Sequence, residues 1–189
     1  MPNWCANKLD VIGPKVDTDH FKHTAHGPTS SYHRFGPNEW GALDDIRKAA
    51  IMSVEPEPGE VSWFSLHQLR PVPIEIRRLG FDNNSAKEVA ESLGLKYPGM
   101  GGYGWQTRKW GTKWDVVMPH PPTWVKPDNL RNHLNYSFYT AWTPPEALIE
   151  YVSRKWPTID FELAYREEGL GIAGWFRYRA GECVMWDQK

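Results

Sequence analysis

Two short stretches bring together residue types that bind ligands. They read Trp110-Gly-Thr-Lys-Trp-Asp115 and Thr140-Ala-Trp-Thr143. The indole rings offer flat surfaces for stacking, and Lys113 adds a mobile cation beside them. The second stretch runs into two prolines, which is typical of a helix start, and a helix N-terminus attracts phosphate and carboxylate groups. We therefore predict a binding site made of Asn7, Trp110, Lys113, Trp114, Asp115, Thr140 and Trp142.

The same residues also allow a purely structural interpretation. The tryptophans would then lie in the core, with Lys113 paired to Asp115, because buried aromatic side chains outnumber those that stack on ligands. Asn7 falls on the core-facing side of a predicted strand, where its amide must find hydrogen-bond partners. The sequence leaves both interpretations open.

Residues able to move protons occur singly. Asp115, His120 and Glu167 could act as acids or bases, but the sequence gives none of them an identifiable partner. The sequence contains neither the nucleophile elbow of the α/β hydrolases nor a phosphate-binding loop motif. The glycine-rich stretch 98–105 lacks the preceding strand and following helix of a dinucleotide site. We therefore expect no cofactor.

Histidine and cysteine spacing gives little sign of a metal site. His20, His23 and His26 recur every three residues, but no acidic or cysteine ligand lies at a suitable spacing. Cys5 and Cys183 lie near opposite ends of the chain and fit neither a disulfide framework nor a zinc site. We therefore expect no bound metal. We also expect that the protein is cytoplasmic and that both cysteines are reduced.

The composition and net charge of the chain exclude some classes of binding partner. The chain has 189 residues and a formal net charge of -1, whereas a general binder of duplex nucleic acid is usually clearly basic. Its 11 Trp, 8 Tyr and 7 Phe supply the apolar area for a folded core. No apolar run reaches the roughly 18–20 residues of a membrane span, so we expect no membrane partner.

Alternating apolar and polar residues predict strands at both ends of the chain. The first lies at 4–13, and four more are predicted at 136–142, 159–165, 170–178 and 183–186. Thr143 is predicted to cap a helix. The buried stripe of that helix is predicted to be Leu148, Ile149, Val152 and Trp156. The pattern predicts an α+β sandwich, an antiparallel-rich sheet with helices packed mainly on one face.

The middle of the chain is less regular. Residues 14–37 are polar, and 97–129 are dense in Gly, Pro and Trp, which predicts an irregular insertion with regular structure only around 113–118. Between them we predict a helix at 38–52, a short strand at 61–66, and a helix that begins near Asn84 or Ser85 and ends at Gly94.

Three stretches follow one another along the chain: Met-Pro-Asn-Trp-Cys-Ala-Asn-Lys-Leu at the start, the stretch 110–115, and Thr-Ala-Trp-Thr-Pro-Pro at 140–145. In this order they resemble the YubB-like family, whose members are encoded largely by phages, prophages and plasmids. The chain departs from the family at 64–73, which lacks the usual Phe-rich strand leading to Pro-Met-Pro. The resemblance implies a ferredoxin-like C-terminal part and a mobile-element setting, and no reaction.

These observations predict a single domain, 1–189, with 105–186 as the ferredoxin-like part and 1–13 adding a strand to the same core. Our leading hypothesis is an accessory protein of a phage or plasmid that binds a macromolecular partner without catalysis. One alternative is a small enzyme that acts on a nucleotide or nucleic acid. The other is a single-stranded nucleic-acid binder that uses the interleaved tryptophans and cations of 105–114.

Overall fold

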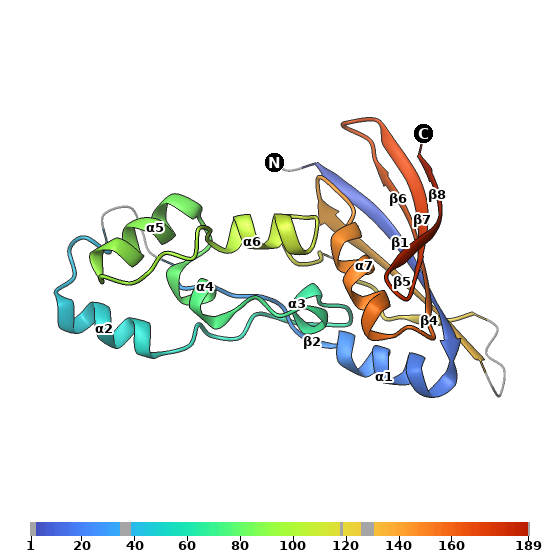
Figure 1. The fold of residues 1–189 in the computed structure, drawn as a ribbon, viewed down its shortest axis with the longest axis horizontal. Coiled ribbons are helices and arrows are strands. Elements are labelled where there is room, and N and C mark those ends of the chain that lie inside the picture. The colour runs from blue at the N-terminus through green and yellow to red at the C-terminus, as the bar shows by residue number, and fades with distance from the viewer. Residues whose placement is uncertain (1–2, 35–38, 118, 126–130, 189) are drawn as a thin grey trace.

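The computed structural model describes residues 3–34, 39–117, 119–125 and 131–188. A twisted sheet with two helices on one face forms one end of the molecule, which we call the sheet lobe (Figure 1). A helical arm made of α2 (Asp45–Ser53), α4 (Ile74–Leu79) and α5 (Asn83–Ser92) extends away from it. The helix α6 (Gly102–Lys109) and the single-turn helix α3 (Leu66–Leu69) lie between the two.

The sheet has six strands in the order β4-β5-β1-β6-β7-β8, and every neighbouring pair is antiparallel. The strands are β1 (Trp4–Pro14), β4 (Thr123–Trp124), β5 (Arg131–Ala141), β6 (Asp160–Glu167), β7 (Ile172–Arg179) and β8 (Glu182–Gln188). Since β5 and β6 both run antiparallel to β1, they run parallel to each other. The helix α7 (Glu146–Lys155) makes the crossover between them, so β5–α7–β6 is a β-α-β unit split by β1.

The predicted α+β class, antiparallel-rich sheet and C-terminal strands are confirmed. On β1, alternate residues from Cys5 to Val11 are buried, as the alternation predicts. The buried stripe of α7 is also confirmed, because Leu148, Ile149 and Val152 are 0% exposed and Trp156 is 7% exposed. Burial of each aliphatic side chain contributes about 1.5–3 kcal/mol. Packing therefore holds α7 on the sheet more than its own helix propensity does.

The helix α1 (Lys15–Ala25) lies in a segment that the sequence presents only as polar. Its buried residues are Thr18, Phe21 and Ala25, a stripe too poor in large apolar side chains to stand out. Phe21 compensates by packing edge-on against Trp156 and Phe161, at ring-centroid distances of 5.3 Å and 5.2 Å. With α7, α1 covers the apolar face of the sheet (Figure 1).

The helical arm has a small apolar cluster of its own. Trp40, Leu79, Ala86, Val89 and Ala90 are its buried members. The predicted helix that ends at Gly94 is confirmed as α5, although Asp82 rather than Asn84 or Ser85 supplies the N-cap. The short β2 (Gly27–Pro28) and β3 (Val61–Ser62) pair next to α3, so the strand predicted at 61–66 ends after two residues.

Two further expectations for the middle of the chain need correction. The helix predicted at 38–52 is present but begins only at Asp45, after the cap of Asp44, and it ends at Ser53. None of its residues is buried, and Ile46 is 83% exposed. Its predicted start, Asn38, lies outside the described residues. Within the supposed irregular insertion, 102–109 forms α6. Around 113–118 the described residues form only an isolated bridge between Val117 and Tyr139.

Candidate functional site

A cluster of three tryptophans and one lysine lies where β1 begins and β5 ends. The Lys113 Nζ is 4.4 Å from the Trp114 ring centroid and 5.5 Å from that of Trp142. The Trp4 and Trp114 rings are 6.0 Å apart. We call Trp4, Lys113, Trp114 and Trp142 the tryptophan patch. Trp4 and Trp142 are each 37% exposed, so the patch presents aromatic surface and a cation to solvent.

Trp142 holds an unusual backbone conformation. Its φ is 72°, in the left-handed region that large side chains rarely adopt. The Thr143 N–H donates to the Ala141 carbonyl at 3.0 Å, which closes a tight turn centred on Trp142. A three-residue turn with positive φ is rare and strained. The strain costs about 1–3 kcal/mol, and it directs a large apolar side chain outward, although the strand alternation predicts that Trp142 faces the core.

The remaining four candidate residues lie inside the protein. Trp110 is fully buried, and its indole N–H donates to the Arg70 carbonyl at 2.9 Å. The Asn7 amide donates to Thr140 Oγ1 at 2.8 Å. Thr140 in turn donates to the Thr143 carbonyl at 2.8 Å. These contacts tie β1 to the end of β5 and give Asn7 the partners that its position requires.

The buried Asp115 carboxylate joins three segments of the chain. It accepts hydrogen bonds from the backbone N–H groups of Leu66 (2.7 Å), Val116 (2.9 Å), Ser30 (3.2 Å) and His67 (3.2 Å) and from the Ser65 hydroxyl (3.1 Å). Burial raises the pKa of Asp115, and the backbone hydrogen bonds oppose that shift. Asp115 is therefore engaged in holding the fold, and Lys113 points instead to the tryptophan rings.

The predicted cap of α7 is wrong. The helix begins at Glu146 with Pro145 at the N-cap position, and no side chain caps it. The Thr143 hydroxyl instead donates to the Gly111 carbonyl at 2.6 Å. The Leu148 N–H donates to the Trp110 carbonyl at 3.2 Å, so part of the helix N-terminus that was predicted to attract an anion is engaged within the fold.

The other residues considered for chemistry are also engaged. The Glu167 carboxylate accepts from the backbone N–H groups of Gly169 (2.8 Å) and Leu170 (2.5 Å) in the turn after β6. Burial raises the pKa of the Cys5 thiol to about 11, which leaves it an unreactive thiol. Cys5 and Cys183 are both free. Within the described ranges no cluster of three or more potential metal ligands occurs. In that same part of the chain, no helix has the length and apolarity to cross a bilayer.

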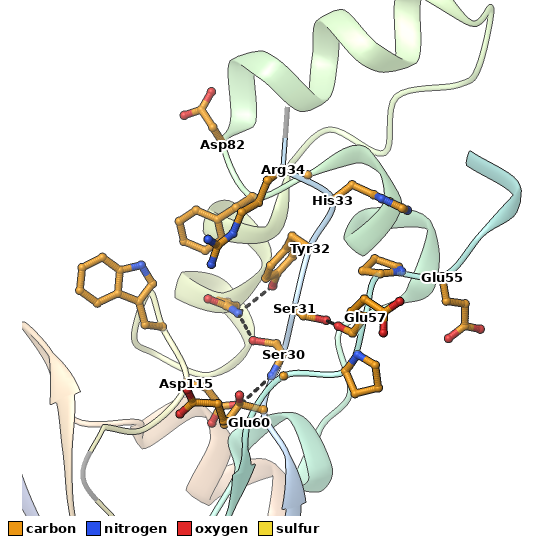
Figure 2. Close-up of a pocket in the computed structure, with 18 of the residues that line it drawn as sticks. Ser30, Ser31, Tyr32, His33, Arg34, Glu55, Glu57, Glu60, Asp82 and Asp115 are labelled. Carbon is orange, nitrogen blue, oxygen red and sulfur yellow. Dashed lines mark hydrogen bonds between the residues drawn. The ribbon is translucent and has the colours of Figure 1, made fainter. Parts of the chain in front are cut away.

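A cleft of about 1060 Å³ adjoins the tryptophan patch. One wall is formed by residues 29–34 and 54–60, joined where the Thr29 N–H donates to the Glu60 carbonyl at 2.9 Å. The opposite wall comes from 80–85, with Asp82 at its edge, and Asp115 lies at the far end (Figure 2). Trp114 also lines the cleft. Its exposed charged residues are Arg34, Glu55, Glu57, Glu60 and Asp82.

The cleft contains the residues that the sequence analysis missed. Tyr32 and Gln106 lie close together in its wall, and Gln106 donates to the Tyr32 hydroxyl at 2.7 Å. Gly102 permits this arrangement, because a Cβ there would overlap the Tyr32 ring. No local pattern marks these residues. They come together only through the fold.

His67 should make the stability of the folded protein depend on pH. Burial, with a smaller effect of Arg77, lowers its pKa from 6.5 to about 4, and its Nδ1 accepts from the Val72 N–H at 3.1 Å. Below pH 6.5 the unfolded chain binds a proton at His67 that the folded protein excludes. The free energy of unfolding should therefore fall as the pH drops from 6.5 towards 4, by about 1–2 kcal/mol at pH 5.

Urea unfolding of the wild type and of His67→Gln at pH 7, 6 and 5 checks this expectation. The wild type should lose more stability than the variant over this range. Equal pH slopes for the two proteins would contradict the assignment.

Comparison with known proteins adds information on the fold. Residues 122–189 match the family model described as the ferredoxin-like domain in Api92-like protein. The chain is similar to a crystal structure of the protein Api92 from Yersinia pseudotuberculosis, with a TM-score of 0.61 and 15% sequence identity. That match covers 100% of this chain and 98% of the other. No curated protein matches the chain. The ferredoxin-like character expected for the C-terminal part is thus confirmed.

Proposed function

We propose that this protein is a non-catalytic binding protein whose partner is another protein. The observation that carries the proposal is the tryptophan patch, in which Trp142 is held at the surface by a strained turn. Strained backbone clusters at functional sites. Tryptophan is also among the residues that dominate binding energy at protein interfaces.

The charges beside the patch favour a protein over a nucleic acid. Four exposed carboxylates line the adjoining cleft, at Glu55, Glu57, Glu60 and Asp82. They would repel the phosphates of a strand that stacked on Trp114. An enzyme is less well supported, because the Asp115 and Glu167 carboxylates are committed to structural hydrogen bonds.

We further propose a phage or plasmid origin, which the resemblance to the YubB-like family supports. The two free cysteines fit a reducing cytoplasm. An accessory protein of this kind would act by occupying a surface of a protein partner, of the host or of the element itself.

Site-specific photo-crosslinking tests the proposal. A benzophenone amino acid is placed at 142 in one protein and at 186 in a control, since Trp186 is exposed on β8 away from the patch. We expect a discrete protease-sensitive adduct only from position 142, and no binding of the purified chain to oligo(dT) or oligo(U). A nuclease-sensitive adduct, or equal labelling from both positions, would overturn it.

The partner identified by mass spectrometry is then purified and titrated. Trp142→Gly should weaken its binding at least about tenfold, a change of about 1.4 kcal/mol. The same change removes the backbone strain, because glycine adopts positive φ without a steric penalty. Thermal stability should therefore be kept, so the lost affinity could not be ascribed to unfolding. Unchanged affinity in Trp142→Gly would contradict the role of the patch.

A further inference from the structure

One buried side chain in the cleft is incompletely hydrogen-bonded. Gln106 is 1% exposed, and its Nε2 donates to Ser30 Oγ at 2.9 Å and to Tyr32 Oη at 2.7 Å. Its Oε1 is buried, and no described residue donates to it. A buried acceptor without a partner costs about 1–3 kcal/mol, so a group that supplies a donor here would be bound favourably.

The orientation of the Gln106 amide identifies the missing group as a donor. If the amide were turned over, Oε1 could accept from the Ser30 and Tyr32 hydroxyls. Both N–H donors of Nε2 would then be buried without partners, in place of one acceptor. The observed orientation leaves fewer groups unsatisfied. Burial also raises the pKa of Tyr32, so its hydroxyl stays protonated.

The charged residues of the cleft indicate that the missing hydrogen-bond donor is cationic. Four exposed carboxylates line it against the single exposed guanidinium of Arg34. Hydrogen bonds from Ser85 and Asn84, at the start of α5, lower the pKa of Asp82 and keep it ionised.

Aromatic side chains line the same cleft. Tyr32 and Phe81 pack with their ring centroids 5.3 Å apart, and Trp114 lines the cleft as well. These rings offer apolar surface to the aliphatic stem of a long cationic side chain, and ring faces attract its charge.

We propose that this cleft binds an extended peptide segment that carries an arginine or lysine side chain, with Gln106 Oε1 accepting from that segment. The cleft volume of about 1060 Å³ lies just above the usual range for small-molecule pockets, which suits several residues of a chain. This inference rests on the proposed function, since it names the chemistry by which a protein partner is recognised beside the tryptophan patch.

Fluorescence anisotropy with short synthetic peptides tests the cleft by itself. The probes are four fluorescein-labelled hexapeptides, Gly-Ala-X-Ala-X-Gly, with X as arginine, lysine, citrulline or glutamate. Citrulline keeps the shape of arginine without its charge. The full chain should bind the arginine and lysine peptides at low ionic strength, more weakly as salt is added, because salt screens exposed charges. The citrulline and glutamate peptides should bind at least about tenfold more weakly, a difference of about 1.4 kcal/mol.

Variants of the protein distinguish the contribution of the Gln106 acceptor from that of the carboxylates around the cleft. Gln106→Leu should weaken the arginine peptide about fivefold or more, which is about 1 kcal/mol. Gln106→Glu should strengthen it, since Ser30 and Tyr32 can donate to a carboxylate and the new charge faces the cation. A triple change to glutamine at Glu55, Glu57 and Glu60 should weaken it about tenfold. The matched control carries the same change at three exposed glutamates outside the cleft, Glu75, Glu88 and Glu182, and should stay within about twofold.

Each contrary result is decisive. Equal binding of the arginine and citrulline peptides, or no binding of the arginine and lysine peptides up to about 1 mM, where the binding free energy is about -4 kcal/mol, would overturn the inference. So would equal effects of the two triple variants, or unchanged affinity in both Gln106 variants. The peptide assay measures the cleft, and the titration of Trp142→Gly with the crosslinked partner measures the tryptophan patch, so a failure of one is distinguishable from a failure of the other.

Discussion

Replacement of Ile149 by aspartate should unfold the whole protein. Ile149 is 0% exposed and belongs to the main apolar cluster, which contains side chains from β1, α1, α6, α7 and the sheet. An ionised carboxylate there would be buried without a partner, and such changes lie in the most destabilising class, above about 4 kcal/mol. Ile149→Val is the control, and it should cost only about 0.5–1.5 kcal/mol.

Hydrogen exchange with circular dichroism measures the outcome. Amides of β1 should lose protection together with those of α7 and β6, because β1 pairs with both β5 and β6 in the centre of the sheet. The single-domain prediction for 1–189 extends this loss to α5. If β1 or the helical arm kept its protection in Ile149→Asp, the chain would have two independently folding parts.

Removal of the Asp115 carboxylate should have the second largest effect. Asp115→Ala leaves the N–H groups of Leu66, Val116, Ser30 and His67 without their acceptor. We expect a loss of about 2–4 kcal/mol, since hydrogen bonds to charged groups are stronger than neutral ones and unpaired buried donors are costly. The measurement is the free energy of unfolding in urea.

Asp115→Asn serves as the comparison for that change. Asparagine keeps an oxygen for Leu66 and Val116 but presents an amide to the two other backbone donors, so its cost should be intermediate. Exchange of the Ser30 and His67 amides should accelerate in both variants. Stability equal to the wild type in Asp115→Ala would show that these contacts contribute little.

The strands of the sheet could be predicted because their alternation is local. β1 and β6 each carry their own alternation of buried and less buried residues, so no knowledge of neighbouring elements is needed. The helices α1 and α6 could not, since their stability comes from contacts far away in the sequence. In α6 the sequence includes two glycines, and the Asn83 side chain accepts from Gly101 and Gly104 to hold its start.

The candidate site was predictable only in part. Lys113, Trp114 and Trp142 come together as the two stretches suggest. The alternation along β5 predicts a core position for Trp142, but β5 ends at Ala141 and the Trp142 side chain lies at the surface. Gln106 and Tyr32 carry no motif, and their relation depends on the packing of α6 against residues 29–34. A sequence pattern cannot show which amide oxygen is left without a donor.

The long connection between α1 and β5 has a consequence for synthesis of the chain. In the antiparallel register, Trp4 pairs with Ala141 and Pro14 with Arg131, so β1 finds its neighbours only more than a hundred residues later. At typical translation rates this delay is roughly 5–30 s. During that time the apolar side chains of β1, such as Leu9 and Val11, have no sheet to cover them. β6, β7 and β8 pair in chain order and can assemble as they emerge. β5 joins them only through β1, so the nascent chain should depend on chaperones until the first strand inserts between β5 and β6.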